Sequence, residues 1–324
     1  MRILFMGTGD IALPSLQALL GSRHEVCGVV TQPDRPVGRH QILHAPPPKV
    51  MAMAAGVPVL QPERVRAAGA LQAITALKPD LIVVMAYGQI LPKALLEIPP
   101  VACINVHASL LPRFRGAACV QGPIDAGDAE SGVTIMHVTE ALDQGDMILR
   151  KAVPLAPDET GGRLHDTLAK LAPAALLEVI DQLEQGTAPR VRQDAELSTY
   201  APKLVREDGG LDWSRPALEL ERRIRAYDPW PGTFTMFTDH RGRARRLKVF
   251  PIAELINRAG DPGEILEASE AGIVVACGQD ALILDEIQPD GGRRVSAGEF
   301  LTGHPLSPTD RFFSLENGGK SAHT

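Results

Sequence analysis

Two polar side chains share one face of an apolar segment near residue 105. Asn105 and His107 lie two positions apart at the end of ACINVHA, a run that predicts a strand over 102–108. Residues i and i+2 of a strand point to the same side, so the amide and the imidazole should face one space. Each also has a plain structural explanation, because asparagine often forms turns and a single histidine is commonly a core residue.

A carboxylate farther along the chain could complete this pair. Asp143 lies in TEALDQGD, the polar loop of a hairpin predicted between VTIMHV and MILRKAVPL. A carboxylate beside His107 would hold one tautomer and stabilise the protonated ring, while Asn105 could donate a hydrogen bond to a developing oxyanion. No serine or cysteine stands beside a predicted base as a nucleophile. The three residues therefore indicate catalysis in which one substrate attacks another directly.

A glycine-containing turn near the N-terminus gives a weaker signal. GTGDIA, residues 7–12, follows a predicted strand and begins a predicted helix, as in the dinucleotide-binding fingerprint. That fingerprint also needs an acid closing the second strand, whereas Asp34 lies beyond that strand in a loop. A tight strand-to-helix turn that requires small residues is the preferred explanation. An oxidoreductase that binds NAD stays as an alternative.

The elements that must position these residues alternate along the first half of the chain. Uninterrupted apolar strands separated by helices predict an α/β fold with a Rossmann-like, mostly parallel sheet covered on both faces. In such sheets the ligand crevice lies at the carboxyl ends of the strands, where Asn105 and His107 are expected. The predicted strands are 2–7, 25–31, 80–87 and 102–108, and the predicted helices are 11–20, 49–56, 71–77 and 160–183.

The chain changes character after about residue 208. Short β-like runs punctuated by Gly, Asp and Pro follow a short basic helix and predict a small OB-like β-barrel. The segment before it mixes Gly, Pro and charges with little periodicity, which predicts a linker. We therefore expect a catalytic domain over 1–190, a linker over 191–207, an OB-like domain over 208–315 and a disordered tail over 316–324.

The composition limits the partners and the compartment. The 324 residues include 33 basic and 39 acidic ones, and the formal charge of -6 argues against wholesale coating of nucleic acid or membrane. Four cysteines without CxxC spacing predict buried free thiols rather than disulfides or zinc ligands. The N-terminus does not resemble a signal peptide, and no apolar run approaches about 18 residues. We expect a soluble, cytoplasmic protein that needs no metal.

Longer stretches around these residues resemble a known family. NVHASLLPRFRGAA and GDAESGVTIMHVTEALDQGDMI resemble the formyltransferases that use 10-formyltetrahydrofolate, whose pattern is Asn-x-His-x-Ser-Leu-Leu-Pro and a later Leu-Asp-x-Gly. TQPDRPVGR, VVMAYGQILP and LERRIRAYDPWPG extend the similarity over most of residues 1 to about 315. The last of these stretches and the final small barrel are similar to the methionyl-tRNA formyltransferase family in particular.

The resemblance implies a reaction and the residues that perform it. Asn105, His107 and Asp143 would be catalytic in moving the formyl group of 10-formyltetrahydrofolate to the α-amino group of methionyl initiator tRNA, in support of translation initiation. No membrane and no obligate protein partner would be involved. The folate would lie against two segments, Tyr87, Gly88, Gln89, Ile90, Leu91 and Pro92, and Ser109, Leu110, Leu111 and Pro112.

The resemblance also implies contacts with tRNA. The loop over 33–49 would enter the acceptor arm, and the C-terminal barrel would bind its outer face. Basic residues in the linker and barrel add electrostatic candidates inside an acidic protein, while Tyr227 and Trp230 are assigned to the core. The expected tRNA contacts are Arg39, Lys203, Arg206, Arg222, Arg223, Arg245 and Arg246.

Three positions depart from the family pattern. Gly9 stands where Pro is usual, and Phe114 stands where Trp is frequent. The sequence His-Gln-Ile at 40–42 follows Arg39, where relatives tend to carry consecutive lysines. The last departure bears on tRNA contact and leaves the predicted chemistry unchanged.

Other functions would fit part of the same pattern. The acceptor could be an amino-sugar nucleotide or a purine-precursor amine, although the basic C-terminal part counts against both. Transfer of the formyl group to water would make the protein a hydrolase. A protein that only binds RNA would have no need of Asn105, His107 and Asp143 together.

Overall fold

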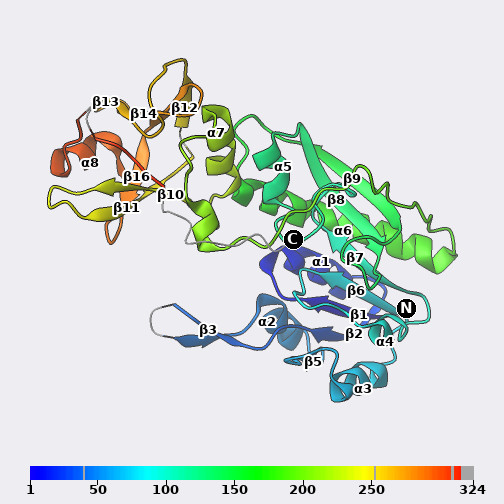
Figure 1. Cartoon of the computed structure of the whole chain (residues 1–324). Helices are drawn as coiled ribbons and strands as arrows, with labels where there is room; N and C mark the ends of the chain where they lie inside the picture. The colour runs from blue at the N-terminus through cyan, green and yellow to red at the C-terminus, as the bar shows by residue number, and fades with distance from the viewer. Residues whose placement is uncertain (39–40, 252, 308–309, 315–324) are drawn as a thin grey trace. The chain divides into compact units, whose positions relative to one another are not determined.

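The computed structural model describes residues 1–38, 41–251, 253–307 and 310–314 (Figure 1). The chain divides into two compact units, and each is considered by itself. The first comprises Met1–Val120, Glu130–Pro154 and Leu164–Pro202. The second comprises Gln121–Ala129, Leu155–Arg163 and Lys203–Thr324.

A seven-stranded sheet forms the centre of the first unit, in the order β5-β2-β1-β6-β7-β8-β9. Neighbouring strands are parallel from β5 to β7, whereas β8 is antiparallel to both β7 and β9. The predicted Rossmann-like, mostly parallel sheet is confirmed. The strands are β1 (Arg2–Gly7), β2 (Glu25–Val30), β5 (Val59–Leu60), β6 (Leu81–Met85), β7 (Ala102–His107), β8 (Glu130–His137) and β9 (Met147–Pro154).

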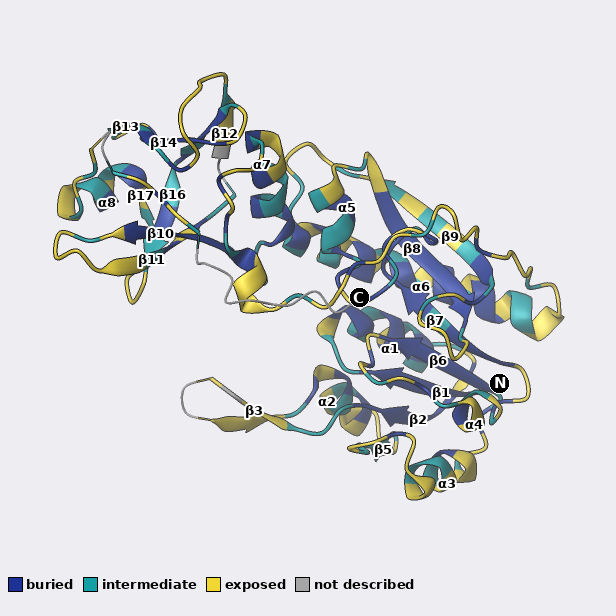
Figure 2. Cartoon of the chain, viewed as in Figure 1, coloured by how far each residue is buried: buried dark blue, intermediate teal, exposed yellow. Residues whose placement is uncertain are grey.

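The central strands of this sheet are apolar on both faces. All residues of β6 and all but the first of β1 are buried, and Figure 2 shows these strands in dark blue. Such continuous apolar runs are expected where helices cover both sides of a parallel sheet. The helices are η1 (Asp10–Ala12), α1 (Leu13–Leu20), α2 (Pro47–Ala54), α3 (Ala68–Ala76), α4 (Lys93–Leu96) and α6 (Gly161–Gln185). Among the described residues, no helix combines the length and apolarity needed to cross a bilayer.

The loop predicted over 33–49 contains regular structure. β3 (Arg35–Val37) and β4 (Ile42–His44) pair as an antiparallel hairpin, and α2 begins at Pro47. Pro36 is compatible with a two-stranded ribbon because each strand has an open edge, so the Pro-rich composition concealed the hairpin. The side chains of Ile42 and Leu43 are 60% and 68% exposed.

Two four-stranded antiparallel sheets form the second unit, in the orders β10-β11-β16-β17 and β12-β15-β14-β13. This confirms the prediction of a C-terminal fold built from short antiparallel strands. The strands are β10 (Thr233–Thr238), β11 (Ala244–Val249), β12 (Ala253–Ile256), β13 (Ile265–Ser269), β14 (Gly272–Ala276), β15 (Ala281–Leu284), β16 (Glu286–Pro289) and β17 (Val295–Ser296). The helices are α5 (Gln121–Ala126), η2 (Arg206–Gly209), α7 (Ala217–Ala226) and α8 (Ala297–Gly303).

One hydrophobic core joins these two sheets. Leu247 of β11 and Val275 of β14 belong to the same buried cluster, together with Ile224 of α7 and Phe300 of α8. Two β-like runs of the sequence, 245–255 and 281–288, each divide into strands of different sheets. A chain that passes from one sheet to the other lets both sheets enclose a single core.

The first part of the predicted linker over 191–207 is bound to the first unit. Val191 exchanges backbone hydrogen bonds with Met147 at 2.8 and 2.9 Å. Arg115 donates its N–H to Thr199 O at 2.9 Å and accepts from Ala201 N at 2.7 Å. Residues 191–202 therefore carry structure that their lack of periodicity did not reveal.

Candidate active site

The end of β7 presents the predicted amide and imidazole on one face. In the register of the sheet, Asn105 pairs with Val84 of β6, and His107 pairs with Thr134 of β8. Figure 1 shows β7 between these two strands. His107 is only 5% exposed, whereas Asn105 is half-buried. Asn105 therefore keeps accessible polar surface, whereas His107 lies within the protein.

The loop between β8 and β9 brings Asp143 to the same place. Asn105 Nδ2 lies 3.5 Å from Asp143 Oδ1, and His107 Nδ1 lies 3.8 Å from Asp143 Oδ2. Gly116 donates its backbone N–H to the same Oδ2 at 2.8 Å. The first unit thus brings Asn105 and Asp143 together, as predicted, although they lie 38 positions apart in sequence.

The orientation of the His107 ring follows from its second nitrogen. Nε2 lies 3.0 Å from the carbonyl oxygen of Phe114. A carbonyl oxygen only accepts, so Nε2 must carry a hydrogen and Nδ1 must face Asp143. In the protonated ring both nitrogens would donate, one to the carbonyl and one toward the carboxylate. The ring therefore has a backbone carbonyl at one nitrogen and a carboxylate near the other.

The segment after β7 has an unusual backbone. Phe114 has φ 58° and Gly116 has φ 103°. A Cβ on Gly116 would also lie 2.6 Å from Ala201 O, so only glycine fits there. Phe114 donates its N–H to Thr199 Oγ1 at 2.8 Å. The segment 199–201 thus supports the loop that aims the Phe114 carbonyl and the Gly116 N–H.

Gln193 is a site residue that the sequence did not indicate. Its side chain donates from Nε2 to the backbone oxygens of Asp143 at 2.8 Å and Gly145 at 2.9 Å. It lies in a stretch without periodicity, where a glutamine side chain is usually exposed to solvent. No local pattern marks it, because its role depends on a loop 50 residues earlier in the chain.

The first predicted folate segment contains both buried and exposed residues. Burial raises the pKa of Tyr87 to about 12, and its hydroxyl has no hydrogen-bond partner among the residues that the structure describes. Leu91 is buried, and Pro92 caps α4. Gln89 accepts a hydrogen bond from Val65 N at 2.8 Å. Ile90 is 81% exposed, and Gly88 is exposed with φ 87°.

The second predicted folate segment is mostly buried. Ser109 donates its hydroxyl to Arg113 O at 2.8 Å, which makes it part of the turn. Leu111 and Pro112 are buried, whereas Leu110 is half-buried. Leu110 is therefore the member of this segment with accessible side-chain surface.

The GTGDIA turn serves the fold in the way the steric explanation predicts. A Cβ on Gly7 would lie 2.8 Å from the Phe5 ring and 2.9 Å from Met85 O. Asp34, the acid nearest the fingerprint position, receives hydrogen bonds from Gln61 and Lys49 at 2.7 Å each, and they lower its pKa. Its carboxylate is therefore already engaged, which disfavours the NAD alternative.

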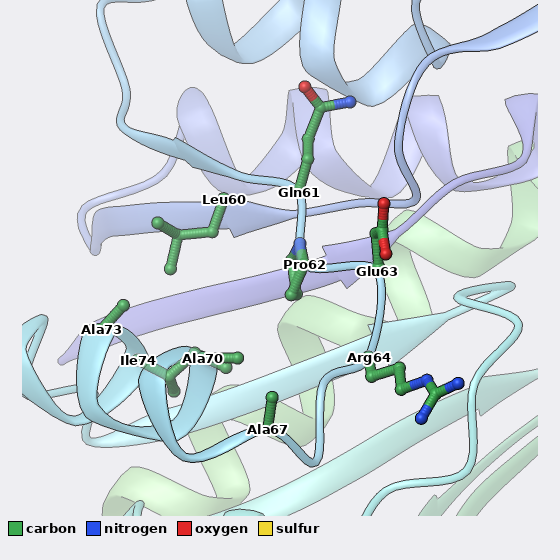
Figure 3. Close-up of a pocket in the computed structure, with 9 residues that line it drawn as sticks. All are labelled: Leu60, Gln61, Pro62, Glu63, Arg64, Ala67, Ala70, Ala73 and Ile74. Atoms are coloured by element: carbon green, nitrogen blue, oxygen red, sulfur yellow. The ribbon is translucent and has the colours of Figure 1, made fainter.

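A pocket of about 440 Å³ lies apart from the three candidate catalytic residues (Figure 3). The segment 60–64 forms one wall, and Ala67, Ala70 and Ile74 face it from the region of α3. Its lining is mainly apolar. Gln89 connects the pocket wall to the exposed Ile90 by donating to Pro62 O at 3.3 Å.

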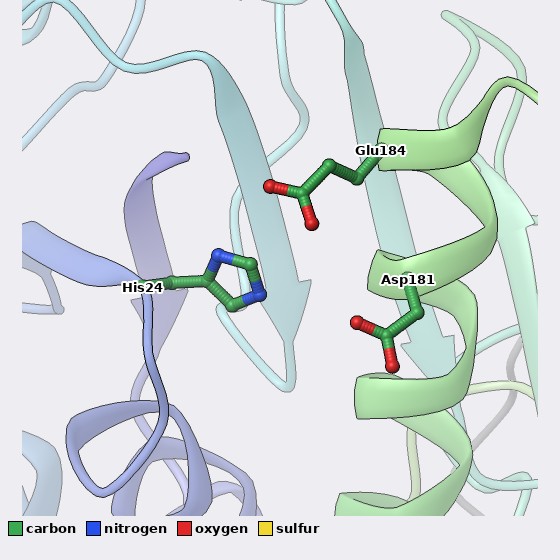
Figure 4. Close-up of side chains that lie close together, drawn as sticks. All are labelled: His24, Asp181 and Glu184. Atoms are coloured by element: carbon green, nitrogen blue, oxygen red, sulfur yellow. The ribbon is translucent and has the colours of Figure 1, made fainter.

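One group of side chains in the first unit has the composition of a metal site. His24, Asp181 and Glu184 approach one another, as Figure 4 shows. However, the Arg23 guanidinium lies 2.8 Å from Asp181 and also contacts Glu184. Arginine already neutralises these carboxylates, so we assign no metal here.

The cysteines are free, as predicted, and unsuited to nucleophilic attack. Cys27, Cys103 and Cys277 are buried, whereas Cys119 is half-buried. Burial raises the pKa of Cys103 and Cys277 to about 12. Burial and the nearby Asp143 charge raise the pKa of Cys119 to about 12 as well. Since the thiolate is the reactive form, the site offers no sulfur nucleophile.

The predicted tRNA contacts differ in how free their charges are. Arg245, Lys203 and Arg206 are exposed. Arg246 lies 3.9 Å above the Phe234 ring. Arg39 lies outside the described residues.

Two of the predicted tRNA contacts are engaged within the second unit. Arg223 forms an ion pair with Asp125 at 3.1 Å. The Arg222 guanidinium packs against Gly127, where an added Cβ would lie 2.3 Å from it. Arg223 in particular contributes to packing and charge balance inside this unit.

One aromatic assignment was wrong. Tyr227 is buried as predicted, but Trp230 is 49% exposed. The Arg206 guanidinium lies 5.9 Å from the centre of its ring. A cation over an aromatic face is stable in water, so the indole does not need the core.

Comparisons with known proteins identify the family to which this chain belongs. The family model described as formyl transferase matches residues 1–180, and the model described as formyl transferase, C-terminal domain, matches residues 203–305. The chain belongs to the formyl transferase family.

Curated relatives narrow the class within that family. The chain is 53% identical to the methionyl-tRNA formyltransferase of Akkermansia muciniphila over 94% of this chain and 97% of the relative. It is 49% identical to that of Pseudomonas putida over 93% of this chain and 95% of the relative. At this similarity over nearly whole chains, it groups with the methionyl-tRNA formyltransferases.

Solved structures share the fold at much lower identity. HypX from Aquifex aeolicus, in complex with tetrahydrofolic acid, matches with a TM-score of 0.61 at 19% identity over 98% of this chain and 51% of that one. The sugar 3N-formyl transferase WlaRD matches with a TM-score of 0.61 at 16% identity over 88% of this chain and 97% of that one. These similarities show a shared fold alone.

Proposed function

We propose that the protein transfers the formyl group of 10-formyltetrahydrofolate to the α-amino group of methionyl initiator tRNA. The convergence of Asn105, His107 and Asp143 in a family of formyl transferases carries the proposal. An enzyme with this acceptor would act in the cytoplasm, where translation begins. In the reaction the amine attacks the formyl carbon, and the carbonyl oxygen gains negative charge.

Two groups of the site would stabilise that oxygen, one by a hydrogen bond and one by its charge. The half-buried Asn105 amide can donate to it directly, and His107 in its protonated form adds positive charge. Neither group needs a covalent bond to the substrate. Both groups are placed before the substrate arrives, which is the condition under which donors are most effective.

Asp143 would control the His107 ring. Its carboxylate faces Nδ1 at 3.8 Å, slightly beyond hydrogen-bond distance, while Phe114 O holds Nε2. Such contacts often shorten only when substrate is bound. The carboxylate would keep the imidazolium charged and oriented, and would help pass the proton lost by the amine to the leaving nitrogen.

The folate would contact the groups left exposed near the strand ends. Ile90 offers an apolar side chain, Gly88 an open backbone, and Leu110 a half-buried surface. Tyr87 and Leu91 would hold the loop from the core rather than touch the ligand. This division fits a flat, partly apolar cosubstrate.

The tRNA would be held by exposed cations and the β3–β4 hairpin. Arg245 and Lys248 on β11 form no ion pair with the described residues, so their charge is available to phosphate. At the hairpin, Ile42 and Leu43 present apolar surface in a loop where relatives tend to carry consecutive lysines after the residue matching Arg39. Contact there would depend more on shape than on charge.

The decisive experiment measures formyl transfer from 10-formyltetrahydrofolate to three acceptors: methionyl initiator tRNA, methionyl elongator tRNA and water. Rapid transfer to the initiator alone is the expected result. Release of formate would instead indicate a hydrolase. Folate binding without transfer to tRNA would contradict the proposed acceptor and direct the assay to amino sugars.

A further inference from the structure

Gln193 joins two separate loops of the site through one buried side chain. It is 7% exposed. Besides the two bonds from Nε2 to Asp143 O and Gly145 O, its Oε1 accepts from Arg115 Nε at 3.1 Å and Nη2 at 2.8 Å. A primary amide has two N–H hydrogens and an oxygen with two lone pairs. Every hydrogen-bonding position of Gln193 is therefore used.

The chemistry of the partners fixes which way the amide points. The guanidinium of Arg115 only donates, and the two backbone carbonyls only accept. The oxygen of Gln193 must face Arg115, and its nitrogen must face the loop between β8 and β9. Glutamate would place oxygen against both carbonyls, and methionine would leave all three partners without a hydrogen bond from this side chain.

In the loop between β8 and β9, Gln193 binds a residue with unfavourable backbone geometry. Asp143 has φ 53°, a left-handed conformation that is uncommon outside glycine. Its carbonyl is held by Gln193, and its carboxylate accepts from Gly116 N. Without the bond from Gln193, Asp143 could relax toward an ordinary conformation, which would turn its carboxylate away from His107.

The second partner of Gln193, Arg115, stands in sequence between the two residues whose backbone groups orient the site. Arg115 lies between Phe114, whose carbonyl binds His107 Nε2, and Gly116, whose N–H binds Asp143. A link from Arg115 to the Asp143 loop thus fixes the carboxylate relative to the group that aims the imidazole.

We propose that Gln193 and Arg115 are positioning residues, which act together to set the separation between the Asp143 carboxylate and His107. The inference rests on the proposed function and adds two residues to its machinery. Their contribution concerns the rate of the chemical step and not the binding of either substrate.

The test compares Gln193→Met and Gln193→Glu with Gln182→Met. Gln182 belongs to the same unit, and its buried side-chain oxygen finds no hydrogen-bond partner within the described part of the chain, so it is a matched control. Since a displacement of about 1 Å can cost roughly 100-fold in rate, both Gln193 variants should lose about 10- to 100-fold in kcat. KM for each substrate should stay within about twofold of wild type. The control should keep wild-type kcat and KM.

Gln193→Glu is the sharper variant because it keeps an acceptor for Arg115 and loses only the donors to the loop. Unchanged kcat in either Gln193 variant would overturn the inference. So would a loss confined to KM or explained by a lower melting temperature alone.

A double-variant comparison tests whether the two residues act as one. Arg115→Met should also lower kcat, and the pair Arg115→Met with Gln193→Met should lose no more than about the worse single variant. If the fold-losses in kcat of the two single variants multiplied in the double variant, the residues would act independently, and their proposed joint role would be contradicted.

A measurement independent of turnover separates this inference from the proposed function. The Gly116 amide hydrogen, bonded to Asp143, should exchange faster with solvent in Gln193→Met than in wild type or Gln182→Met. Unchanged exchange would overturn the positioning role, whatever the reaction. Absence of formyl transfer by wild type, with faster Gly116 exchange in the variant, would count against the function alone.

Discussion

At the scale of single residues, the site assigns different tasks to similar polar groups. Asn105 keeps exposed surface, His107 is buried with both ring nitrogens directed at protein acceptors, and Asp143 is held at its carbonyl and its carboxylate. In the proposed mechanism, direct contact with a reacting oxygen would therefore fall to Asn105. The other two residues would provide charge and fix orientation without touching that oxygen.

Replacing Asn105 by alanine should slow the reaction without unfolding the protein. Loss of one oxyanion donor typically costs on the order of 100- to 1,000-fold in turnover, and a half-buried side chain at a strand end leaves the core intact. Steady-state formyl transfer and a thermal melt measure both effects. Turnover close to wild type would remove Asn105 from the proposed mechanism.

His137 should make stability depend on pH. Burial and then the Arg190 charge lower its pKa, although Asp146 opposes this, and Arg190 Nη2 lies 3.5 Å from Nδ1. The unfolded chain gains the proton near pH 6.5, before the folded protein does. The free energy of unfolding therefore falls as the pH drops below about 6.5, and levels off below the folded pKa.

Melting temperatures of wild type and His137→Gln between pH 5 and 7.5 check this expectation. The difference between the two proteins should vary with pH below about 6.5 and stay constant above it. Other histidines titrate equally in both proteins, so the comparison isolates His137. Parallel curves over the whole range would contradict a lowered pKa.

At the scale of elements, the loop between β8 and β9 is fixed at its base by close backbone approach. His137 donates its N–H to Asp146 O at 2.9 Å. Gly145 lies so close to His137 that a Cβ would come within 1.7 Å of His137 O. The position of Asp143 therefore depends on a glycine two residues later.

Gly145→Ala should destabilise the protein and displace Asp143. Overpacking of this kind costs about 1–3 kcal/mol, or a fall of roughly 2–10 °C in melting temperature, and kcat should fall with it. Gly69→Ala is the matched control, since a Cβ there meets nothing within 4 Å and lies in α3, where alanine is favoured. Equal melting temperatures for the two variants would refute the steric account.

The elements also show which parts of the structure can be predicted from sequence patterns. β1, β6 and β7 were predictable because their continuous apolar runs are short, which favours buried strands over helices. The shared face of Asn105 and His107 followed from their spacing. The β3–β4 hairpin was not predictable because its Pro-rich composition concealed two short strands that pair with each other. Gln193 and Thr199 were not predictable because their partners come from distant segments. The division of 245–255 into two strands likewise depends on the tertiary core.

At the scale of the whole molecule, the excess of acidic residues coexists with a cationic strand in the second unit. Arg245, Arg246 and Lys248 lie along β11, and the β10 side chain Phe234 underlies one of them. A local cluster of this kind can bind phosphate although the net charge of the protein is -6. Binding of tRNA should therefore be electrostatic in part.

Affinity for tRNA should fall as salt rises, with a log–log slope of roughly 0.7 to 0.9 per phosphate neutralised. Arg245→Gln should reduce that slope by about one such increment. Arg258→Gln is the control, because Arg258 already pairs with Glu267 at 3.0 Å. A flat salt response in wild type, or equal slopes for the two variants, would contradict the assignment.

The support of the active-site loop by residues 193–201 has a consequence for how the enzyme is made. The three proposed catalytic residues leave the ribosome before Gln193, Thr199 and Ala201. The nascent chain therefore contains the proposed catalytic groups before the residues that hold them in place. A fragment ending at residue 190 would contain all three groups and lack their support. Activity should therefore emerge late in synthesis, once the chain has grown past residue 201.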